Sequence, residues 1–451
     1  MSLPYSLAFG LQKLNGYSTQ YFRLETTNLT EVNPYGVITL NLPVNVLCNL
    51  KSLSMHCKGR ANETSIACVD GAVPPVADSV ITTLPNGIEK LISRVEIYSG
   101  GIAISSGMSQ YSTVSTVLDN LKTTLNKEVS YQRVLKNQEI NVNTDDYYQK
   151  ERPYILNNFL QFIGESAPDY VDTALLPSIQ LRFFMHGPEV LGAYQKSLGA
   201  GNGFAGTGAA QLAANATWKL TDLHFTIETI TFSNGVYDSA VERKLKEDSY
   251  IEMPFTNYFT FQDTQTQMTK SNRFSLSAQS LDMLYAVQRP SDYNSVNTGL
   301  HKIDNKIGAT FVPSYFRFYA GDIQSWQYNV NSVYYPNYRA TALDAFNLVT
   351  IGKADNYSDD SGCKVNSLEN WYNSYWTAML RLNMPMPGMG PRNCSGIDTR
   401  GLNSSLFLVT QKSSKADPLQ TPLDTGNETF IIAQCTSIIR IGMGRMIEVV
   451  V

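Results

Sequence analysis

Short stretches in which apolar and polar residues alternate run along most of this 451-residue chain. In the first half the alternation is clear at 37–42, 179–183 and 223–232. A period of two predicts strands with one buried side and one solvent-facing side. In the last of these stretches the apolar positions change phase after Thr229. We expect a bulge or a corner there, because a slip of one residue turns every later side chain to the other face.

The second half of the chain has the same style. Strands are expected at 251–255, 315–319, 326–330, 430–435 and 446–451. Pro254 predicts an edge position for the first of them, because proline has no N–H to donate to a neighbouring strand.

Four short helices are expected between the strands, at 114–121, 237–247, 280–288 and 368–379. Each has apolar residues at helical spacing on one side. The second also places Glu242 four residues before Lys246, which is the favourable order for an ion pair on a helix. The third has Leu281, Leu284 and Tyr285 on one side, and Pro290 is expected to end it.

Evenly spaced strands in two similar halves favour an all-β chain built from a pair of sandwiches or jelly rolls. The fold we expect is two consecutive eight-stranded jelly rolls with a few short helices in the connections. The length supports two domains, because a single core rarely serves so many residues. We expect an N-terminal extension at 1–19, a first jelly roll at 20–236, a linking helix at 237–248 and a second jelly roll at 249–451. One large barrel or a propeller is the alternative, but no repeat of blade length is present.

Composition adds that the surface is weakly charged. Charged residues make up 16% of the chain while hydrophobic residues make up 43%, and there are 26 tyrosines. Such a surface is either neutral and polar or covered by other subunits. A net charge of −4 argues against nucleic-acid binding as the main task. No apolar stretch is long enough for a transmembrane helix, and the start of the chain lacks the pattern of a signal peptide.

Cysteine and histidine spacing gives no metal motif. His56 beside Cys57 is the nearest approach to a ligand pair, but adjacent residues of a strand point to opposite faces. We expect reduced thiols and neither a zinc site nor a disulfide framework. The six cysteines are at 48, 57, 68, 363, 394 and 435, and the four histidines are His56, His186, His224 and His301.

Candidate catalytic groups are equally weak. The chain has no G-x-S-x-G turn for a serine nucleophile. Asp145–Asp146 and Asp359–Asp360 are paired carboxylates, the minimum for a glycosidase, but both pairs lie among turn-forming polar residues and are expected to be solvated. Asp355 with the second pair could bind calcium, although EF-hand spacing is absent.

Two further segments are candidates for binding. The loop at 189–216 is rich in glycine, but it lacks the lysine and the serine or threonine that end a phosphate-binding P-loop. Aromatic residues at 315–338 could stack sugars, although core packing and subunit contacts explain them better. The sequence therefore names no catalytic residue, no cofactor-binding residue and no metal ligand.

Four segments carry a resemblance to a known family. Residues 91–104 resemble a helix-to-strand passage that ends in a Gly-Gly turn, and 220–232 with 249–261 resemble a passage between two jelly rolls. Residues 274–288 are similar to a strand and helix that open a second roll, and 395–404 to the turn before the last strands. In this order the segments resemble double jelly-roll major capsid proteins of icosahedral double-stranded DNA viruses, of the polinton-like virus and virophage type within the lineage of the adenovirus hexon.

The resemblance implies a non-enzymatic virion protein that is made and assembled inside the host cell. It implies a homotrimer with pseudo-hexagonal outline, lateral contacts between trimers, and penton and minor capsid proteins as partners. A near-neutral inner surface is consistent with an internal membrane, and no specific nucleic-acid binding is expected. Two alternatives stay open here: a carbohydrate-binding or glycoside-processing β-sandwich protein, and a minor capsid or penton protein, although the latter usually needs one jelly roll.

Overall fold

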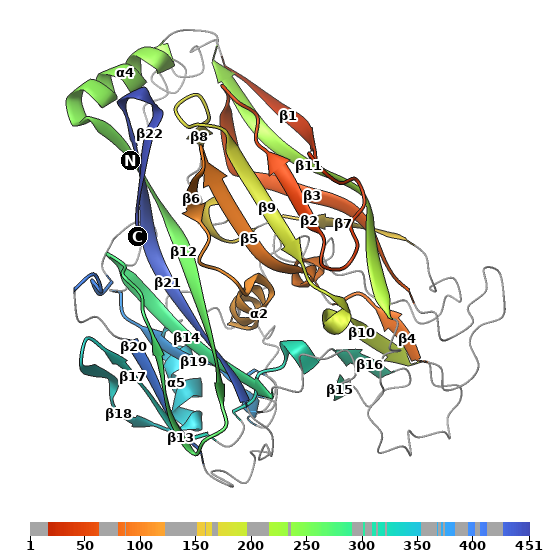
Figure 1. The fold of residues 1–451 in the computed structure, drawn as a ribbon. Helices are drawn as coiled ribbons and strands as arrows, with labels where there is room; N and C mark the ends of the chain where they lie inside the picture. The colour runs from red at the N-terminus through yellow and green to blue at the C-terminus, as the bar shows by residue number, and fades with distance from the viewer. Residues whose placement is uncertain are drawn as a thin grey trace, which may run out of the picture.

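A computed structural model defines the architecture of the chain (Figure 1). It describes residues 17–62, 80–121, 151–195, 216–290, 301–412 and 427–451, apart from gaps at 86, 158, 165–169, 233–235, 303–308, 313, 321–322, 353–367, 369–370, 373–374, 384–395 and 402–405.

The first half forms a sandwich of two antiparallel sheets. One sheet has the order β1-β11-β3-β7, with the short β8 also paired to β3, and the other has the order β2-β9-β5-β6. The strands are β1 (Tyr17–Glu25), β2 (Val37–Asn41), β3 (Leu47–Asn62), β5 (Ile92–Ser99), β6 (Ile102–Ser105), β7 (Arg152–Leu156), β8 (Val171–Asp172), β9 (Ile179–Met185) and β11 (Thr217–Phe232).

The second half forms another sandwich of two antiparallel sheets. Their orders are β12-β21-β14-β19, with β22 also paired to β21, and β13-β20-β17-β18. The strands are β12 (Tyr250–Gln265), β13 (Thr269–Phe274), β14 (Leu281–Pro290), β17 (Ile323–Val330), β18 (Val333–Ala340), β19 (Ala378–Arg381), β20 (Leu406–Lys412), β21 (Asn427–Gly442) and β22 (Met446–Val450).

The two sandwiches have the same connectivity. When the eight main strands of each are numbered along the chain, both halves pair in the orders 1-8-3-6 and 2-7-4-5. Each also places a helix between its fifth and sixth strands: α2 (Tyr111–Leu121) in the first and α5 (Ala342–Gly352) in the second. This strand order is that of a jelly roll, so the chain is a double jelly roll.

The remaining elements include those that connect the two rolls. Helix α4 (Val236–Asp248) follows the last strand of the first roll, and it has the predicted Glu242–Lys246 ion pair at 3.8 Å. A small sheet has the order β15-β16-β10-β4, so it combines strands from both halves: β4 (Val80–Thr83), β10 (Gly192–Gln195), β15 (His301–Lys302) and β16 (Ala309–Val312). Short 3-10 helices are η1 (Ile88–Leu91), η3 (Gln161–Ile163), η4 (Pro188–Val190), η6 (Ser314–Phe316) and η8 (Met443–Arg445).

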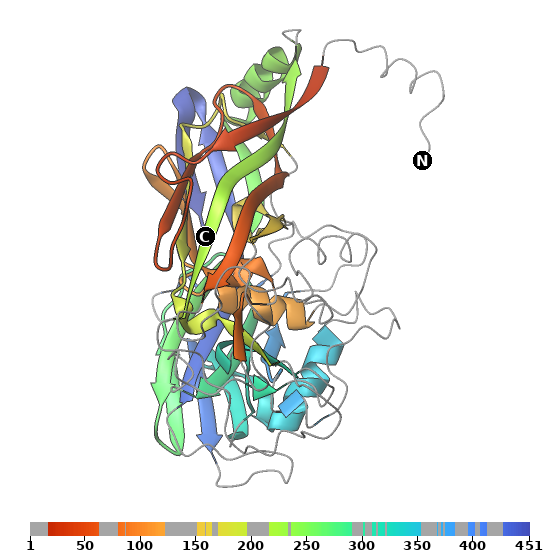
Figure 2. The ribbon, with the colours of Figure 1, turned by 90° about the vertical axis from the view of Figure 1, so that its right-hand side faces the viewer.

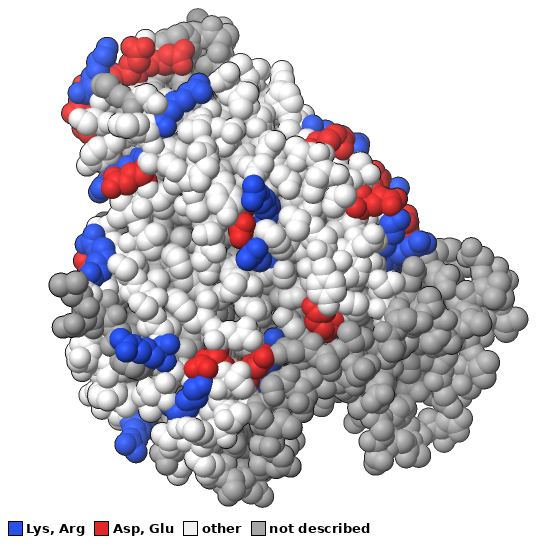
Figure 3. All heavy atoms as spheres, viewed as in Figure 1, with Lys and Arg blue, Asp and Glu red and all other residues white. Residues whose placement is uncertain are grey.

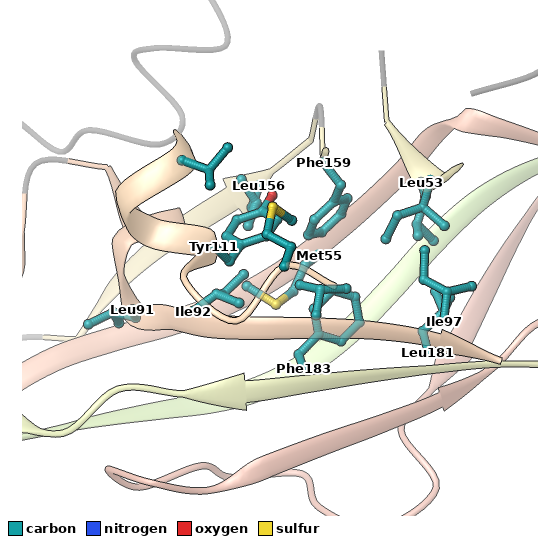
Figure 4. Close-up of a cluster of buried hydrophobic side chains, with 14 of the residues drawn as sticks. Leu53, Met55, Leu91, Ile92, Ile97, Tyr111, Leu156, Phe159, Leu181 and Phe183 are labelled. Carbon is teal, nitrogen blue, oxygen red and sulfur yellow. The ribbon is translucent and has the colours of Figure 1, made fainter. Parts of the chain in front are cut away.

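The hydrophobic core of the first roll closes around aromatic residues (Figure 4). Phe183 on β9 stacks on Phe225 of β11 with ring centroids 5.5 Å apart, and it contacts Phe159 at 5.4 Å. This core continues into the second half, where Tyr285, Phe430 and their neighbours belong to the same cluster. A separate core fills the second roll around Trp326, Tyr328 and Trp376. One sheet of the second roll therefore contributes side chains to both cores.

Most predicted elements are confirmed. The strands at 37–42, 179–183, 251–255, 326–330, 430–435 and 446–451 and the helices at 114–121 and 237–247 are present within a few residues of the predicted limits. β12 lies at the edge of its sheet, as Pro254 indicated. The Gly-Gly turn of 91–104 joins β5 to β6, with both glycines at positive φ. The domain borders at 19/20, 236/237 and 248/249 stay a prediction.

One helix prediction is wrong and another is confirmed only in part. The stretch 280–288 is not a helix, because it forms strand β14. Of the helix predicted at 368–379, the described residues 368, 371 and 372 are helical, whereas 378 and 379 belong to strand β19. In β14 the residues Leu281, Leu284 and Tyr285 are all buried, since one face of this strand meets each core. Burial on both faces removes the alternation of a strand, and the remaining apolar positions imitate helical spacing.

Three local predictions also need correction. In β11 the register shifts lie at 221/224 and 226/228, not after Thr229, which is itself buried. Residues 315–319 contain η6 and a single bridge at Phe318 in place of a strand. The loop expected from 189 begins with η4 and β10, where main-chain pairing with β4 and β16 makes a strand from a glycine-rich sequence. Among the described residues no helix is long and apolar enough to span a membrane.

Candidate functional site

The acidic and glycine-rich candidates lie outside the described residues. These are Asp145–Asp146, Asp355, Asp359–Asp360 and the glycine runs of 199–208, together with Cys68, Cys363 and Cys394. The part of the chain that the structure does describe contains no group of three His, Cys, Asp or Glu side chains arranged to hold a metal ion.

The described cysteines are buried free thiols. Cys48 and Cys57 belong to the core of the first roll and Cys435 to that of the second. Burial raises the pKa of Cys57 to about 12, and burial with the nearby Asp172 raises that of Cys48 to about 12. Burial, with a smaller effect of Asp282, raises the pKa of Cys435 further. Because the thiolate is the reactive form, these cysteines behave as small core residues.

The aromatic residues at 315–338, which could stack sugars, are mostly part of the core. Tyr315, Phe316, Phe318, Trp326 and Tyr328 are all less than 9% exposed. Only the later members of the segment, on β18, face solvent. A shallow hollow of about 260 Å³ on the first roll contains one charged group, Arg94. The guanidinium of Arg94 is already paired with Glu96 at 3.2 Å and lies 4.0 Å from the Phe184 ring.

The densest arrangement of polar and charged side chains lies at the junction of the two rolls. Arg289 of β14 is 2% exposed, and its guanidinium lies between two rings, 3.8 Å from that of Tyr315 and 4.5 Å from that of Phe430. The same group donates to the Tyr315 carbonyl oxygen at 2.8 Å and pairs with Glu428 of β21 at 3.4 Å. Gln262 of β12 donates to the other Glu428 oxygen at 3.2 Å, so three strands fix this ion pair.

A second group of side chains continues the junction into the first roll. The His186 ring meets the edge of Tyr315 with centroids 5.3 Å apart. Its Nε2 lies 2.7 Å from Ser112 Oγ of α2, and its Nδ1 lies 3.1 Å from Glu189 Oε1. Burial alone would raise the pKa of Glu189, but hydrogen bonds from His186 and the Gly187 N–H lower it overall. The contacts therefore favour a carboxylate here and join α2 to η6.

A third contact lies along the outer edge of β12. Asn257 is 2% exposed, and its side-chain oxygen accepts from Ser105 at 2.9 Å while its side-chain N–H donates to Ser437 at 3.3 Å. Thr260 donates its N–H to the Gly107 carbonyl at 3.1 Å. A Cβ at Gly107 would lie 2.2 Å from the Phe259 ring, so only glycine permits this approach. In both ribbon views β12 and β21 extend beyond the second roll alongside the first (Figures 1 and 2).

The surface differs in character from this junction. White, uncharged side chains cover most of the face in Figure 3, and the charged ones are scattered. Exposed apolar side chains gather on β18 and the start of α5, at Val333, Tyr334, Tyr338, Leu343 and Phe346, with exposures of 39–51%. Among the described strands β18 lies at the edge of its sheet, where a further chain could pair. A patch of this kind typically marks a protein–protein contact.

Comparison with known proteins gives no match to a family model and none to a curated protein. Solved structures do match over nearly the whole chain. PBCV-1 VP54, fitted into a reconstruction of the virophage Sputnik, has a TM-score of 0.57 at 11% identity, with 96% of both chains covered. The Sputnik virophage structure gives 0.57 at 10%, covering 97% of this chain and 89% of the other. The Faustovirus major capsid protein gives 0.54 at 9%, covering 94% and 91%.

These likenesses place the chain in a structural class. The matched proteins are double jelly-roll major capsid proteins, and this chain has their fold. The resemblance found in the four sequence segments is therefore confirmed at the level of fold. Sequence reasoning missed the junction, although Arg289 and Glu428 gave a signal: each is a charged residue within two positions of an apolar run, 284–287 for Arg289 and 430–433 for Glu428.

The junction ion pair generates a stability prediction. Arg289→Met should lower the free energy of unfolding by about 3–5 kcal/mol, because it leaves the Glu428 carboxylate buried without its partner. The double variant Arg289→Met with Glu428→Gln should recover much of that loss. Thermal unfolding by calorimetry is the measurement, with the exposed Arg400→Met as a control expected to change stability by less than about 0.5 kcal/mol. Equal effects in the control and the single variant would contradict this account.

The buried thiols generate a second prediction. At pH 8 a thiol with a pKa of about 12 is roughly one part in 10⁴ thiolate. A disulfide reagent should therefore leave Cys48, Cys57 and Cys435 unmodified in the folded protein and modify them after unfolding in urea. Peptide mass spectrometry identifies each site. Rapid modification of any of the three without unfolding would show that its surroundings open to solvent.

Proposed function

We propose that this chain is a major capsid protein, which forms pseudo-hexagonal homotrimers that tile the icosahedral shell of a double-stranded DNA virus. The observation that carries the proposal is the strand order 1-8-3-6 and 2-7-4-5, which is repeated in one chain whose halves share a buried junction. Three such chains offer six similar walls, so one gene product can build a hexagonal tile. The neighbours in fold that are named above are capsid components.

The chemistry of the surface supports assembly rather than catalysis. The described cysteines are buried thiols, and the described residues hold no group of three His, Cys, Asp or Glu side chains placed to bind a metal ion. The weakly charged surface lets copies approach without stripping water from many ions. The chain then acts as a non-enzymatic building block located in the virion, as the sequence resemblance implied.

The partners follow from the same proposal. The first partner is a second copy of the chain, and trimers then contact one another laterally. Penton and minor capsid proteins would complete the shell, and an internal membrane would be compatible with a near-neutral inner wall. A carbohydrate-binding role has lost its main support, because most of the aromatic segment at 315–338 is packed in cores.

The mass of the purified protein tests the proposal. We expect a species of three times the 50.1-kDa chain in analytical ultracentrifugation, and shell-like particles when the chain is expressed with its partners. A strictly monomeric protein at high concentration, with no particles on co-expression, would contradict it.

The apolar patch on β18 and α5 gives the same experiment a residue-level arm. Tyr334→Glu with Tyr338→Glu should shift the equilibrium toward monomer, because charge at a contact must be desolvated on association. Ala240→Glu, on the exposed face of α4, adds the same kind of charge at a helical site and serves as the control. Circular dichroism should show that both variants remain folded.

A further inference from the structure

Two of the four histidines of the chain lie directly opposite each other on the outer face of the β1-β11-β3-β7 sheet. His56 on β3 is the cross-strand partner of His224 on β11. Their rings stack with centroids 4.9 Å apart and planes 10° from parallel. Both side chains are half-buried, so protons reach them while the sheet still shields their mutual interaction.

Hydrogen bonds hold both rings in place. His56 Nε2 lies 3.0 Å from Thr226 Oγ1, and His224 Nδ1 lies 3.2 Å from the carbonyl oxygen of Asp222. Asp222 itself has a φ of 52°, which a residue other than glycine seldom adopts. The stack is therefore built into the backbone and does not result from two mobile side chains that happen to meet.

The main-chain ladder is interrupted on both sides of the pair. The register of β3 with β11 shifts between Thr221 and His224 and again between Thr226 and Glu228. The histidines thus occupy a three-residue paired segment, 224–226 against 54–56, between two irregularities. The ladders of β11 with β1 and of β3 with β7 run past this segment without a break, so the short β3–β11 pairing between the two bulges is the part expected to open first.

The charges that face the pair balance one another. β1 brings Arg23 and Glu25, which pair at 2.7 Å, and Glu25 is the cross-strand partner of His224. Lys58 of β3 and Asp222 of β11 pair at 3.2 Å. On β7 the partners of His56 and Lys58 are Ile155 and Pro153, which do not titrate. The two positive and two negative side chains cancel, so the surroundings supply no net negative charge that would stabilise an added proton on the stack.

We propose that this stacked pair is a proton-operated switch, in which acidification adds a proton to the stack and opens the bulged segment of β3 and β11. His56 would take up this proton against the face of the His224 ring, in half-buried surroundings that disfavour the charge. Opening the segment separates the rings and restores their hydration. The consequence is a local loss of structure in one wall of the first roll.

The expected loss of stability on acidification agrees with the titration of His56. Burial, followed by His224 and Arg23, lowers the pKa of His56 from its ordinary 6.5. A histidine whose pKa is lower in the folded state binds more protons when unfolded. Its contribution to stability is therefore complete above pH 6.5 and is lost as the pH falls from that value toward the folded-state pKa.

Hydrogen–deuterium exchange with mass spectrometry tests the switch on the full chain. Between pH 7.5 and 5.5, exchange of peptides covering 52–58 and 220–229 should rise several-fold after correction for the intrinsic rate, because the open segment binds protons more tightly than the closed one. Peptides of β17 and β20 in the second roll serve as an internal reference. The variant His56→Gln with His224→Asn keeps one hydrogen-bonding group of each ring and should abolish the rise.

A matched control removes charge from the same sheet without changing the pair. Lys219 lies on β11 near the pair and forms an ion pair with Glu31. Lys219→Gln breaks this ion pair and should retain the full response to acid. NMR of ¹³C-labelled histidine gives an independent readout: His224→Asn should move the titration midpoint of His56 upward, because the stacked ring is one cause of its lowered pKa. A His56 midpoint that His224→Asn leaves unchanged, or an unchanged acid response in the double variant, would overturn the proposal.

Discussion

Burial of the β12-β21-β14-β19 sheet on both faces is the constraint on which the rest of the molecule depends. One face belongs to the core of the second roll, and the other belongs to the core that begins in the first roll. Each charged group on that second face must therefore be paired. Arg289 lies between two rings and beside Glu428 for this reason, since an unpaired ion at this depth would cost several kcal/mol. The junction is a shared hydrophobic core that contains a buried ion pair and hydrogen bonds. It is not a contact between two domains that each have a complete core of their own.

The alternation of apolar and polar residues predicted the strands of the outer sheets well, because each of those strands has one buried face and one solvent-facing face. Residues 37–42 and 326–330 illustrate the case in which a period of two survives in the sequence. β14 illustrates the opposite case. Its side chains are dry on both faces, so its sequence lost the period of two and imitated a helix. The fold class was therefore accessible from the sequence, whereas the strand nearest the junction was not.

The features that give the molecule its chemistry were hidden for a related reason. His56 and His224 are 168 positions apart, and only the register of β3 against β11 brings their rings together. The same holds for Arg289 and Glu428, and for Asn257 with Ser105. Spacing along one strand carries no information about which residue lies opposite on the next. What could be read from the chain was negative: scattered histidines, no metal motif, and carboxylate pairs placed in turns.

The small sheet that joins β10 to β16 has a mechanical consequence. It returns the chain to the first roll after the second has begun, so the rolls are linked at that sheet as well as through α4. These attachments and the shared core together suppress the hinging that a single connecting helix would allow. We therefore expect the chain to behave as a stiff plate. Any curved surface assembled from many copies must then obtain its bend at the seams between plates, and the angle of those seams decides how large the enclosed volume becomes.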